Sequence, residues 1–488
     1  MKPALLLGGL LGFGIFFLVG CRQAQQAPRT ALTPAKPGVT LTQWIVKYDL
    51  RLPLVKKDSE FTPTPFLPVA FTPVVTPPPI SRQEANSQAK NPPVTPIPPP
   101  MPLLGDQAIA GDDVINYLLI GSDQGSGSLF RTDTLILASI RPRQQAVTLI
   151  SIPRDLFVYI PGWTMQRINT AYLHGQVIKY PGGGAALLKE TIRYNLGIRV
   201  DHLAIVDFKG FKKIVDTLDG IDVPLVCPYT DWQVIDPNGN LENPNNWRLY
   251  TAGPGIVHMD GEMALWYARS RLRSNDFDRG RRQQETLRAI YHRALQLDVL
   301  ARLPDLYSQM NEIVRTDVGL DDILALAPMA LTLDSPRIRS YYISNKYVKA
   351  WWTPEGANVL LPKIEKIQAI LQEAMSPPDM QTEQRLTLLV EISNASGKEG
   401  LEMLAAERLH YGGYETRVIS YGGEKIPKTQ IYDFSDGQQP EQLAFLLKYM
   451  GLPAERVSTM DDLGTDAAFR VALGRDYDPC FNPAKVNR

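Results

Sequence analysis

Six arginines lie close together in the segment Ala268–Gln284, which reads ARSRLRSNDFDRGRRQQ. They are Arg269, Arg271, Arg273, Arg279, Arg281 and Arg282. A guanidinium group stays charged and donates paired hydrogen bonds, which suits it to phosphate oxygens. The same segment could also be a solvated run of charge or a patch that binds nucleic acid.

The second half of this segment is expected to begin a helix, with Asp278 as its cap. Arg279 and Arg282 then lie three positions apart on one face of the first turns. Positive charge near a helix N-terminus opposes the helix dipole and costs stability unless an anion lies nearby. The placement therefore favours an anion-binding site over a solvated run of charge.

Two aspartates flank a Gly/Ser-rich loop in YLLIGSDQGSGSLFRTDT. Asp123 follows a candidate strand, and Arg131 and Asp133 lie where the next strand begins. Carboxylates at neighbouring strand ends can converge on one hard cation such as Mg²⁺. Taken alone, both aspartates could equally be turn or cap residues.

Arg154 and Asp155 follow a third candidate strand, in SIPRDLFVYIPG. An arginine at a strand end is well placed for bidentate contact with phosphate, although the two residues could also form a surface ion pair. In RINTAY, Asn169 and Tyr172 could orient a ligand or cap a helix.

Other catalytic schemes lack their residues. The five histidines show no HExxH spacing, and the chain has no GxSxG, GxxxxGK or GxGxxG motif. Three dispersed cysteines give no basis for a zinc site or a Cys–His nucleophile. Cys227 and Cys480 could pair outside the cytosol, but their spacing leaves the pairing open.

The elements that must position these residues alternate between strand and helix patterns from about Asp112 onward. VINYLLIG, DTLILASIRP and AVTLISIPRD predict strands, GGGAALLKETIRYNLG and FKGFKKIVDTLDG predict helices, and RIRSYYIS predicts an edge strand. This alternation is typical of an α/β fold with helices on the faces of a sheet. A linker at Ser376–Gln384 precedes a smaller α/β unit.

The N-terminus predicts export. An apolar stretch ends in LVGC at Cys21, which resembles a bacterial lipobox with a lipidated cysteine; an uncleaved signal anchor is the alternative. Between Phe61 and Pro102, 14 of 42 residues are proline, which predicts an extended stalk. Export and a balanced charge, with 51 Lys+Arg and 51 Asp+Glu, argue against nucleic-acid binding.

Several segments together resemble the LytR–CpsA–Psr (LCP) family of bacterial cell-envelope proteins. They are NYLLIGSD…RTDTLILASI, VTLISIPRDLFVYIPG, RINTAY, HLAIVDFKGFKKIVDTLDGIDV and MDGEMALWYARSRLRSNDFDRGRRQQ. The resemblance runs in order from about Asp112 to Leu297. Residues 386–478 are similar to the LytR C-terminal-type domain that is often attached to such proteins.

The resemblance implies a three-layer α-β-α domain with a mixed central sheet, acting as a phosphotransferase (EC 2.7.8-like). LCP proteins move a glycopolymer from a polyprenyl-diphosphate carrier to a cell-wall acceptor, commonly peptidoglycan, with the help of Mg²⁺; Mn²⁺ is the alternative cation. This chain would do so at the extracytoplasmic face of the bacterial cell membrane, held there by its N-terminal lipid or anchor. Two other functions stay open: a hydrolase of lipid diphosphates, and a non-catalytic envelope protein that binds prenyl phosphate or glycan.

The resemblance also assigns roles. The metal-binding pair would be Asp123 and Asp133, and the catalytic group at the reacting phosphate and acceptor hydroxyl would be Asp133, Arg154 and Asp155. The diphosphate would be bound by Arg154, Arg269, Arg271 and Arg279, with Arg131 and Arg282 as second-tier candidates. Arg273 and Arg281 are expected to be replaceable.

The expected organisation has six parts. They are a signal peptide or anchor at 1–21, a Pro-rich linker at 22–105, an LCP catalytic domain with a helical extension at 106–375, a linker at 376–385, the LytR C-terminal-type domain at 386–478 and a tail at 479–488.

Overall fold

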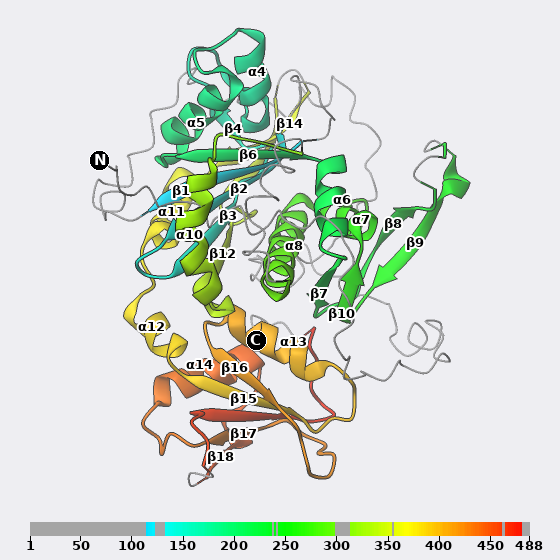
Figure 1. Ribbon diagram of the computed structural model, residues 1–488, viewed down its shortest axis with the longest axis vertical. Helices are drawn as coiled ribbons and strands as arrows, with labels where there is room; N and C mark the ends of the chain where they lie inside the picture. Colours follow the sequence, from blue (N-terminus) through cyan, green and yellow to red (C-terminus); the bar gives the residue numbers. More distant parts are fainter. Residues whose placement is uncertain are drawn as a thin grey trace, which may run out of the picture.

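The computed structural model describes residues 114–480, except 123–131, 237–238, 241–242, 298–312, 354–355 and 461–463. The predictions for residues 1–21 and 22–105 therefore lie outside the described residues. The chain forms two α/β units, a larger one and a smaller one, as the fold class predicts (Figure 1). Within the described part of the chain, every helix is too short or too polar to cross a bilayer.

The larger unit is built on a mixed six-stranded sheet with the order β11-β6-β1-β2-β3-β12. Its strands are β1 (Ile115–Ser122), β2 (Thr132–Arg141), β3 (Ala146–Ser151), β6 (His202–Asp207), β11 (Val314–Thr316) and β12 (Ile338–Tyr342). β1 pairs parallel with β6 and antiparallel with β2, and β12 is an edge strand, as expected. Two strand ends and one strand start therefore meet at the same edge: β1 and β6 end where β2 begins.

Helices cover both faces of this sheet, so the predicted three layers are present (Figure 1). Alternate residues of β1 face opposite cores: Tyr117 and Leu119 face one, Leu118 and Ile120 the other. One layer holds α6 (Phe208–Thr217), α7 (Gly261–Arg269), α8 (Asp276–Gln296) and α10 (Leu320–Thr332). The other holds α4 (Ala171–Val177), α5 (Gly183–Leu196) and α11 (Ile364–Met375).

Four two-stranded ribbons surround the main sheet. They are β4 (Phe157–Tyr159) with β5 (Met165–Arg167), β7 (Ile221–Leu225) with β10 (Gly255–Met259), β8 (Tyr229–Val234) with β9 (Trp247–Ala252), and β13 (Val348–Trp352) with β14 (Asn358–Pro362). The β8–β9 hairpin extends away from the body of the unit (Figure 1).

The smaller unit contains a five-stranded sheet with the order β16-β15-β19-β17-β18. Its elements are β15 (Leu389–Asn394), α13 (Leu401–Tyr411), β16 (Glu415–Ile419), β17 (Gln430–Asp433), α14 (Pro440–Met450), β18 (Val457–Thr459) and β19 (Phe469–Leu473). The segment predicted as a linker, residues 376–385, contains most of a short helix. Asp379 accepts a hydrogen bond from the Thr382 backbone N–H and thereby begins α12 (Met380–Leu386).

A disulfide joins the two units. Cys227, between β7 and β8, is bonded to Cys480, which lies 253 positions later in the segment predicted as a tail. Cys227 is buried in the apolar core of the smaller unit, and Arg408 of α13 donates a hydrogen bond to the Pro479 carbonyl at 2.6 Å. The smaller unit is therefore fixed to the larger one, and the start of the tail is part of the junction.

A buried charge cluster joins the units a second time. Arg288 of α8 donates to the Ser335 hydroxyl, lies 3.6 Å from the Glu407 carboxylate of α13, and covers the Tyr411 ring at 4.2 Å. Burial alone would raise the pKa of Glu407, but the His410 ring, whose Nδ1 lies 3.6 Å from the carboxylate, and the charge of Arg288 lower this pKa to about 2. Glu407 therefore stays ionised inside the junction.

The start of α8 differs from the expectation. Its cap is Asn275, whose side-chain oxygen accepts from the Asp278 backbone N–H, whereas Asp278 is a buried residue of the first turn. The Asp278 carboxylate pairs with Arg281 at 3.0 Å and with Arg282 at 3.1 Å. The first turn thus supplies its own acidic partners, so the position of these arginines does not by itself require a bound anion.

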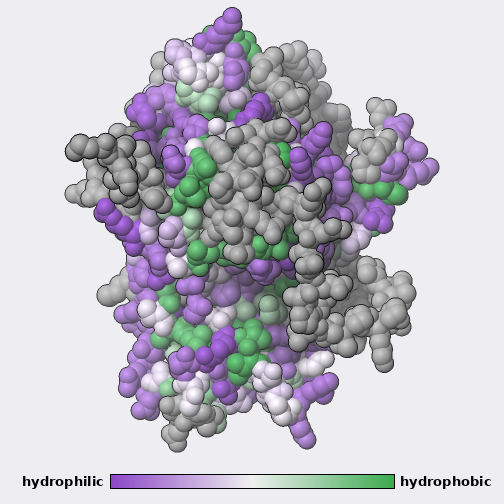
Figure 2. Space-filling view, viewed as in Figure 1, coloured by the Kyte–Doolittle hydropathy of each residue, from purple (hydrophilic) through white to green (hydrophobic). Residues whose placement is uncertain are grey.

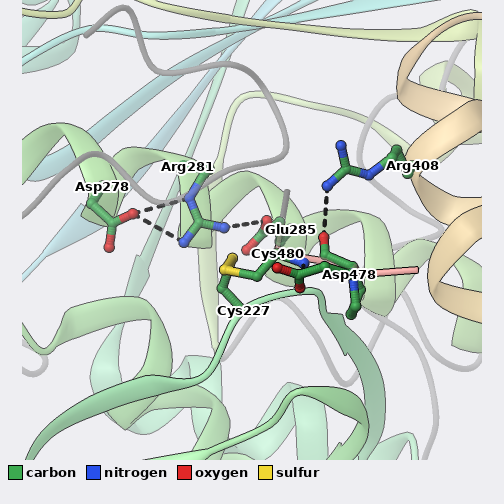
Figure 3. The surroundings of a disulfide bond; sticks show 8 residues. Cys227, Asp278, Arg281, Glu285, Arg408, Asp478 and Cys480 are labelled. Atoms are coloured by element: carbon green, nitrogen blue, oxygen red, sulfur yellow. Dashed lines mark hydrogen bonds and ion pairs between the residues drawn. A yellow bond between two sulfur atoms is a disulfide. The ribbon is translucent and has the colours of Figure 1, made fainter. Parts of the chain in front are cut away.

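Arg281 and Arg282 are both structural residues. Arg281 also pairs with Glu285, and Figure 3 shows this row of buried charges in the region of the disulfide. Arg282 is fully buried and donates to the Tyr267 and Ser270 carbonyls, which fixes the end of α7 and the segment after it. This burial argues against the expectation that Arg281 is replaceable, because its removal would leave the buried Glu285 carboxylate without its cation and Asp278 with Arg282 alone.

We predict that Arg281→Ala lowers the free energy of unfolding by about 3–5 kcal/mol, as expected when one partner of a buried ion pair is removed. Arg273→Ala is the matched control, since Arg273 is exposed in the same segment and should change stability by about 0.5 kcal/mol or less. Denaturant unfolding followed by circular dichroism measures both. Equal effects of the two substitutions would contradict the structural role of Arg281.

We also predict a pH-dependent junction. Because folding lowers the pKa of Glu407, its ionised carboxylate stabilises the folded state. This stabilisation is complete above the ordinary pKa of 4.5 and is lost as the pH falls toward 2. When the pH is lowered from 4.5 to 2, the melting temperature of Glu407→Gln should therefore fall less than that of the unsubstituted chain. The exposed Glu424→Gln is the control and should follow the unsubstituted chain; identical pH profiles for all three proteins would exclude this role.

Candidate active site

A cavity of about 250 Å³ opens at the sheet edge where β1 and β6 end and β2 begins. It lies between that edge and the helices α6, α7 and α8. Its depth is apolar, lined by Leu119, Ile120, Ile136, Ala204, Val206, Phe208, Phe211, Ile214, Leu265, Leu287 and Ile290. Four of these side chains, those of Val206, Phe208, Phe211 and Ile214, come from the segment VDFKGFKKIV.

Polar and charged residues complete the lining of the cavity. Five of them are predicted site residues: Asp133, Arg154, Arg269, Arg271 and Arg279. The fold brings them together from β2, from the connection between β3 and β4, and from the arginine segment. Since α7 ends at Arg269 and α8 begins at Asp276, the non-helical residues between them allow arginines from both sides to reach one cavity.

Arg154 is held by three carboxylates. Its guanidinium donates to the Asp133 carboxylate, and its Nε lies 3.4 Å from Asp276 Oδ2 and 3.5 Å from Asp155 Oδ2. Burial alone would lower the pKa of Arg154, but the charges of Asp276, Asp133 and Asp155 raise it. The residue therefore stays cationic at the cavity.

Asp276 connects the arginines to one another. Its carboxylate accepts from Arg271 Nη1 at 3.0 Å and from Arg279 Nη2 at 3.4 Å, in addition to its contact with Arg154. Burial would raise the pKa of Asp276, whereas Arg279, Arg271 and Arg154 lower it. One ionised carboxylate thus fixes the relative positions of three guanidinium groups.

The carboxylates do not fully compensate the positive charge of these arginines. Arg279 is buried, and burial together with the nearby charges of Arg154 and Arg271 lowers its pKa to about 10 despite Asp276. The Nε–H groups of Arg154 and Arg279 are buried and have no hydrogen-bond partner among the described residues. Buried donors of this kind stabilise an oxyanion placed within their reach.

Two residues that support the site were not identified from the sequence. Asp276 holds the arginines of the cavity, and an acidic residue directly after an Asn cap is a recognisable start of a helix. Gln283 lies one turn after Arg279 and donates to the Thr134 hydroxyl at 2.9 Å and to the Ala268 carbonyl at 3.2 Å. The i,i+4 spacing from Arg279 could have identified it.

Other predicted residues lie elsewhere. Arg282 points into the network described above and is not part of the cavity lining, which corrects its assignment as a diphosphate ligand. Asp155 pairs with Arg154 and Arg167 beside the cavity without lining it. Cys21, Asp123 and Arg131 lie outside the described residues.

The residues fit a hard cation only in part. No group of three or more His, Cys, Asp or Glu side chains in the described ranges is arranged to hold a metal ion. Asp133 brings a carboxylate to the cavity, which is the donor type that Mg²⁺ and Mn²⁺ prefer, but it is shared with Arg154. Metal binding by Asp133 together with Asp123 stays a prediction.

Curated relatives match about half of the chain. It is 30% identical over 218 residues to the polyisoprenyl-teichoic acid–peptidoglycan teichoic acid transferase TagU of Enterococcus faecalis, covering 43% of this chain and 64% of that protein. It is 29% identical over 268 residues to the corresponding transferase TagV of Bacillus subtilis, covering 52% of this chain and 63% of that protein. The matches thus span less than two thirds of each relative.

The crystal structure of B. subtilis TagV is similar with a TM-score of 0.43 and 26% identity, over 54% of this chain and 99% of that one. The family model described as the LytR_cpsA_psr family matches residues 81–375, which is more than half of the chain and includes the whole cavity. The chain therefore belongs to the LytR_cpsA_psr family.

Proposed function

We propose that this protein transfers a glycopolymer from a polyprenyl-diphosphate carrier to a cell-wall acceptor such as peptidoglycan, at the extracytoplasmic face of the membrane. The observation that carries the proposal is the cavity itself, whose largely apolar lining is joined by the arginines Arg154 and Arg279, with Nε–H groups that are buried and make no hydrogen bond to any described residue. A prenyl diphosphate has the same division into a long apolar chain and a compact anion. The names of the TagU and TagV relatives agree with this substrate class.

In the proposed reaction, the acceptor hydroxyl oxygen attacks the phosphorus that carries the glycan. A new P–O bond forms as the phosphoanhydride bond breaks, and prenyl monophosphate leaves. Arg154 and Arg279 hold the diphosphate oxygens and stabilise the charge that develops on them. The hydroxyl proton passes to Asp133, which lines the cavity and is better placed than Asp155.

Asp276 acts in this scheme by positioning the arginines, since its carboxylate contacts all three guanidinium groups and has no proton to donate to the phosphate. A bound Mg²⁺, held by Asp133 and Asp123, would neutralise charge on the diphosphate oxygens. A lipid on Cys21, or an uncleaved signal anchor, would hold this site outside the cell and close to the membrane.

We predict that Arg154→Ala and Arg279→Ala each reduce transfer by about 10²–10³-fold, the usual effect of removing a buried charge-stabilising donor. Arg273→Ala is the control, because Arg273 is exposed and does not line the cavity. The assay follows a labelled lipid-linked glycan with and without peptidoglycan as acceptor. Full activity of both variants would refute the assignment, and free glycan as the sole product would identify a hydrolase.

We further predict that Asp276→Asn lowers transfer by about tenfold and raises KM more than it lowers kcat, because three guanidinium groups lose their common partner. Steady-state kinetics with a short-chain donor measure the two constants separately. A fall in kcat with unchanged KM would indicate that Asp276 takes part in the chemical step instead.

A further inference from the structure

The β4–β5 ribbon has one face on the core and one face turned away from it. Val158 belongs to an apolar core of the larger unit, so Phe157 and Tyr159, on either side of it in β4, point away from that core. Arg167 lies opposite Phe157, and Met165 lies opposite Tyr159. Directly opposite residues share a face. We call these four residues the outer face of the ribbon.

Four aromatic rings form a row along this outer face. The ring of Trp351 on β13 lies 5.8 Å from the Phe157 ring, and the ring of Tyr194 on α5 lies 5.3 Å from the Tyr159 ring, measured between centroids. Phe157 is buried, whereas the other three are half-buried and keep part of their surface exposed. We call these rings the aromatic row: Trp351, Phe157, Tyr159 and Tyr194.

The row is assembled from three separate parts of the chain. β14 lies beside β4 through a parallel bridge between Leu156 and Leu360, and the Leu360 N–H donates to the Asp155 carbonyl at 2.9 Å (Figure 1). On the other side, Asn195 of α5 accepts from the Tyr159 N–H at 3.1 Å and donates to the Tyr159 carbonyl at 2.7 Å. Backbone hydrogen bonds therefore fix both ends of the row relative to β4.

The aromatic row begins beside the active site. Arg167 Nε lies 3.3 Å from Asp155 Oδ1, and the other oxygen of the same carboxylate lies 3.5 Å from Arg154 Nε. Arg154 lines the cavity, whereas Asp155 and Arg167 do not. One carboxylate thus joins the outer face to the reacting centre, and the row leads away from the cavity.

The composition of this surface indicates a carbohydrate ligand. A sugar ring has an apolar face of C–H bonds and a rim of hydroxyl groups. Aromatic rings pack against the first, while a carboxylate and a guanidinium group accept from and donate to the second. Because the charges of Asp155 and Arg167 are paired with each other, they favour a ligand rich in hydroxyls over a polyanion.

The neighbouring surface is polar as well. In Figure 2 the surface over α4 and α5, at the top of the view, is mostly purple or pale with little green. This is the character of a surface that binds a water-soluble ligand, and it differs from that of a face that enters lipid.

We infer that the aromatic row, with Asp155 and Arg167, is the subsite that binds the glycan strand of the acceptor. The inference deepens the proposed function and rests on it. In that function the prenyl chain of the donor occupies the cavity and its diphosphate lies against Arg154. An acceptor strand that lies along the row brings a hydroxyl group to Arg154 and its partner Asp133 without entering the cavity. The row sets the affinity for the acceptor and takes no part in the chemical step.

The kinetic test compares Trp351→Leu with the unsubstituted full chain, using soluble, uncrosslinked peptidoglycan strands as acceptor. Leucine keeps an apolar side chain and removes the flat ring, so the KM for the strands should rise about tenfold, with much smaller changes in kcat and in the KM for the lipid-linked donor. Trp232→Leu, a partly exposed tryptophan on β8, is the matched control and should leave all three constants unchanged.

Two outcomes of this comparison would overturn the inference. One is an acceptor KM that is the same in Trp351→Leu and in the control, and the other is a rise in the donor KM alone, which would assign the row to the donor glycan. Thermal unfolding shows whether Trp351→Leu is folded. If it is not, Tyr194→Leu on α5 decides the question by the same kinetic criteria.

A binding measurement separates this inference from the proposed function. Titration calorimetry of the full chain in detergent with the same strands, without donor, should detect binding that Tyr159→Leu and Tyr194→Leu each weaken about fivefold. If the unsubstituted chain binds strands in this way but transfers nothing, the proposed function fails while the role of the row stands. If the chain transfers glycan but both variants bind strands as tightly as the unsubstituted chain, the inference fails and the proposed function stands.

Discussion

The buried carboxylate of Asp278 is the interaction on which the rest of the site depends. It holds Arg281 and Arg282 in the first turns of α8, and Arg282 in turn binds the carbonyls at the end of α7. The two helices are therefore fixed where the arginine segment leaves one and enters the other. A buried ion pair seldom adds much stability compared with apolar packing, but breaking one is costly, so the network acts mainly by restricting the geometry.

This restriction explains why six neighbouring arginines have different roles. Arg281 and Arg282 hold the scaffold, Arg269, Arg271 and Arg279 reach the cavity, and Arg273 is exposed. Arg154 joins from another part of the chain, and Asp276 connects it to the segment. The site thus has two parts. At the cavity, carboxylates share guanidinium groups that are proposed to bind phosphate, and in the buried network Arg281 and Arg282 are paired with Asp278 and Glu285.

The sequence predicted the fold class, the main strands and helices, and five residues of the cavity, because apolar periodicity and local motifs are properties of short segments. It could not identify Arg281 and Arg282 as buried structural residues, since only the packing of α8 against its neighbours decides which of its arginines pair inside the core. The role of Asp276 was missed because it depends on Arg154, which comes from a distant part of the chain. The helix α12 was hidden by two prolines that precede it, which are equally typical of a linker.

The junction between the two units has a practical consequence for dissecting the protein. A fragment that ended near residue 375 would keep the cavity but would leave Cys227 as a lone thiol beside Val226, with both side chains deprived of the core that buries them. It would also leave Arg288 without Glu407, at the centre of the same helix that carries Arg279. Loss of activity in such a fragment would therefore reveal little about what the smaller unit binds, because the cut itself disturbs the helix on which the active site is built.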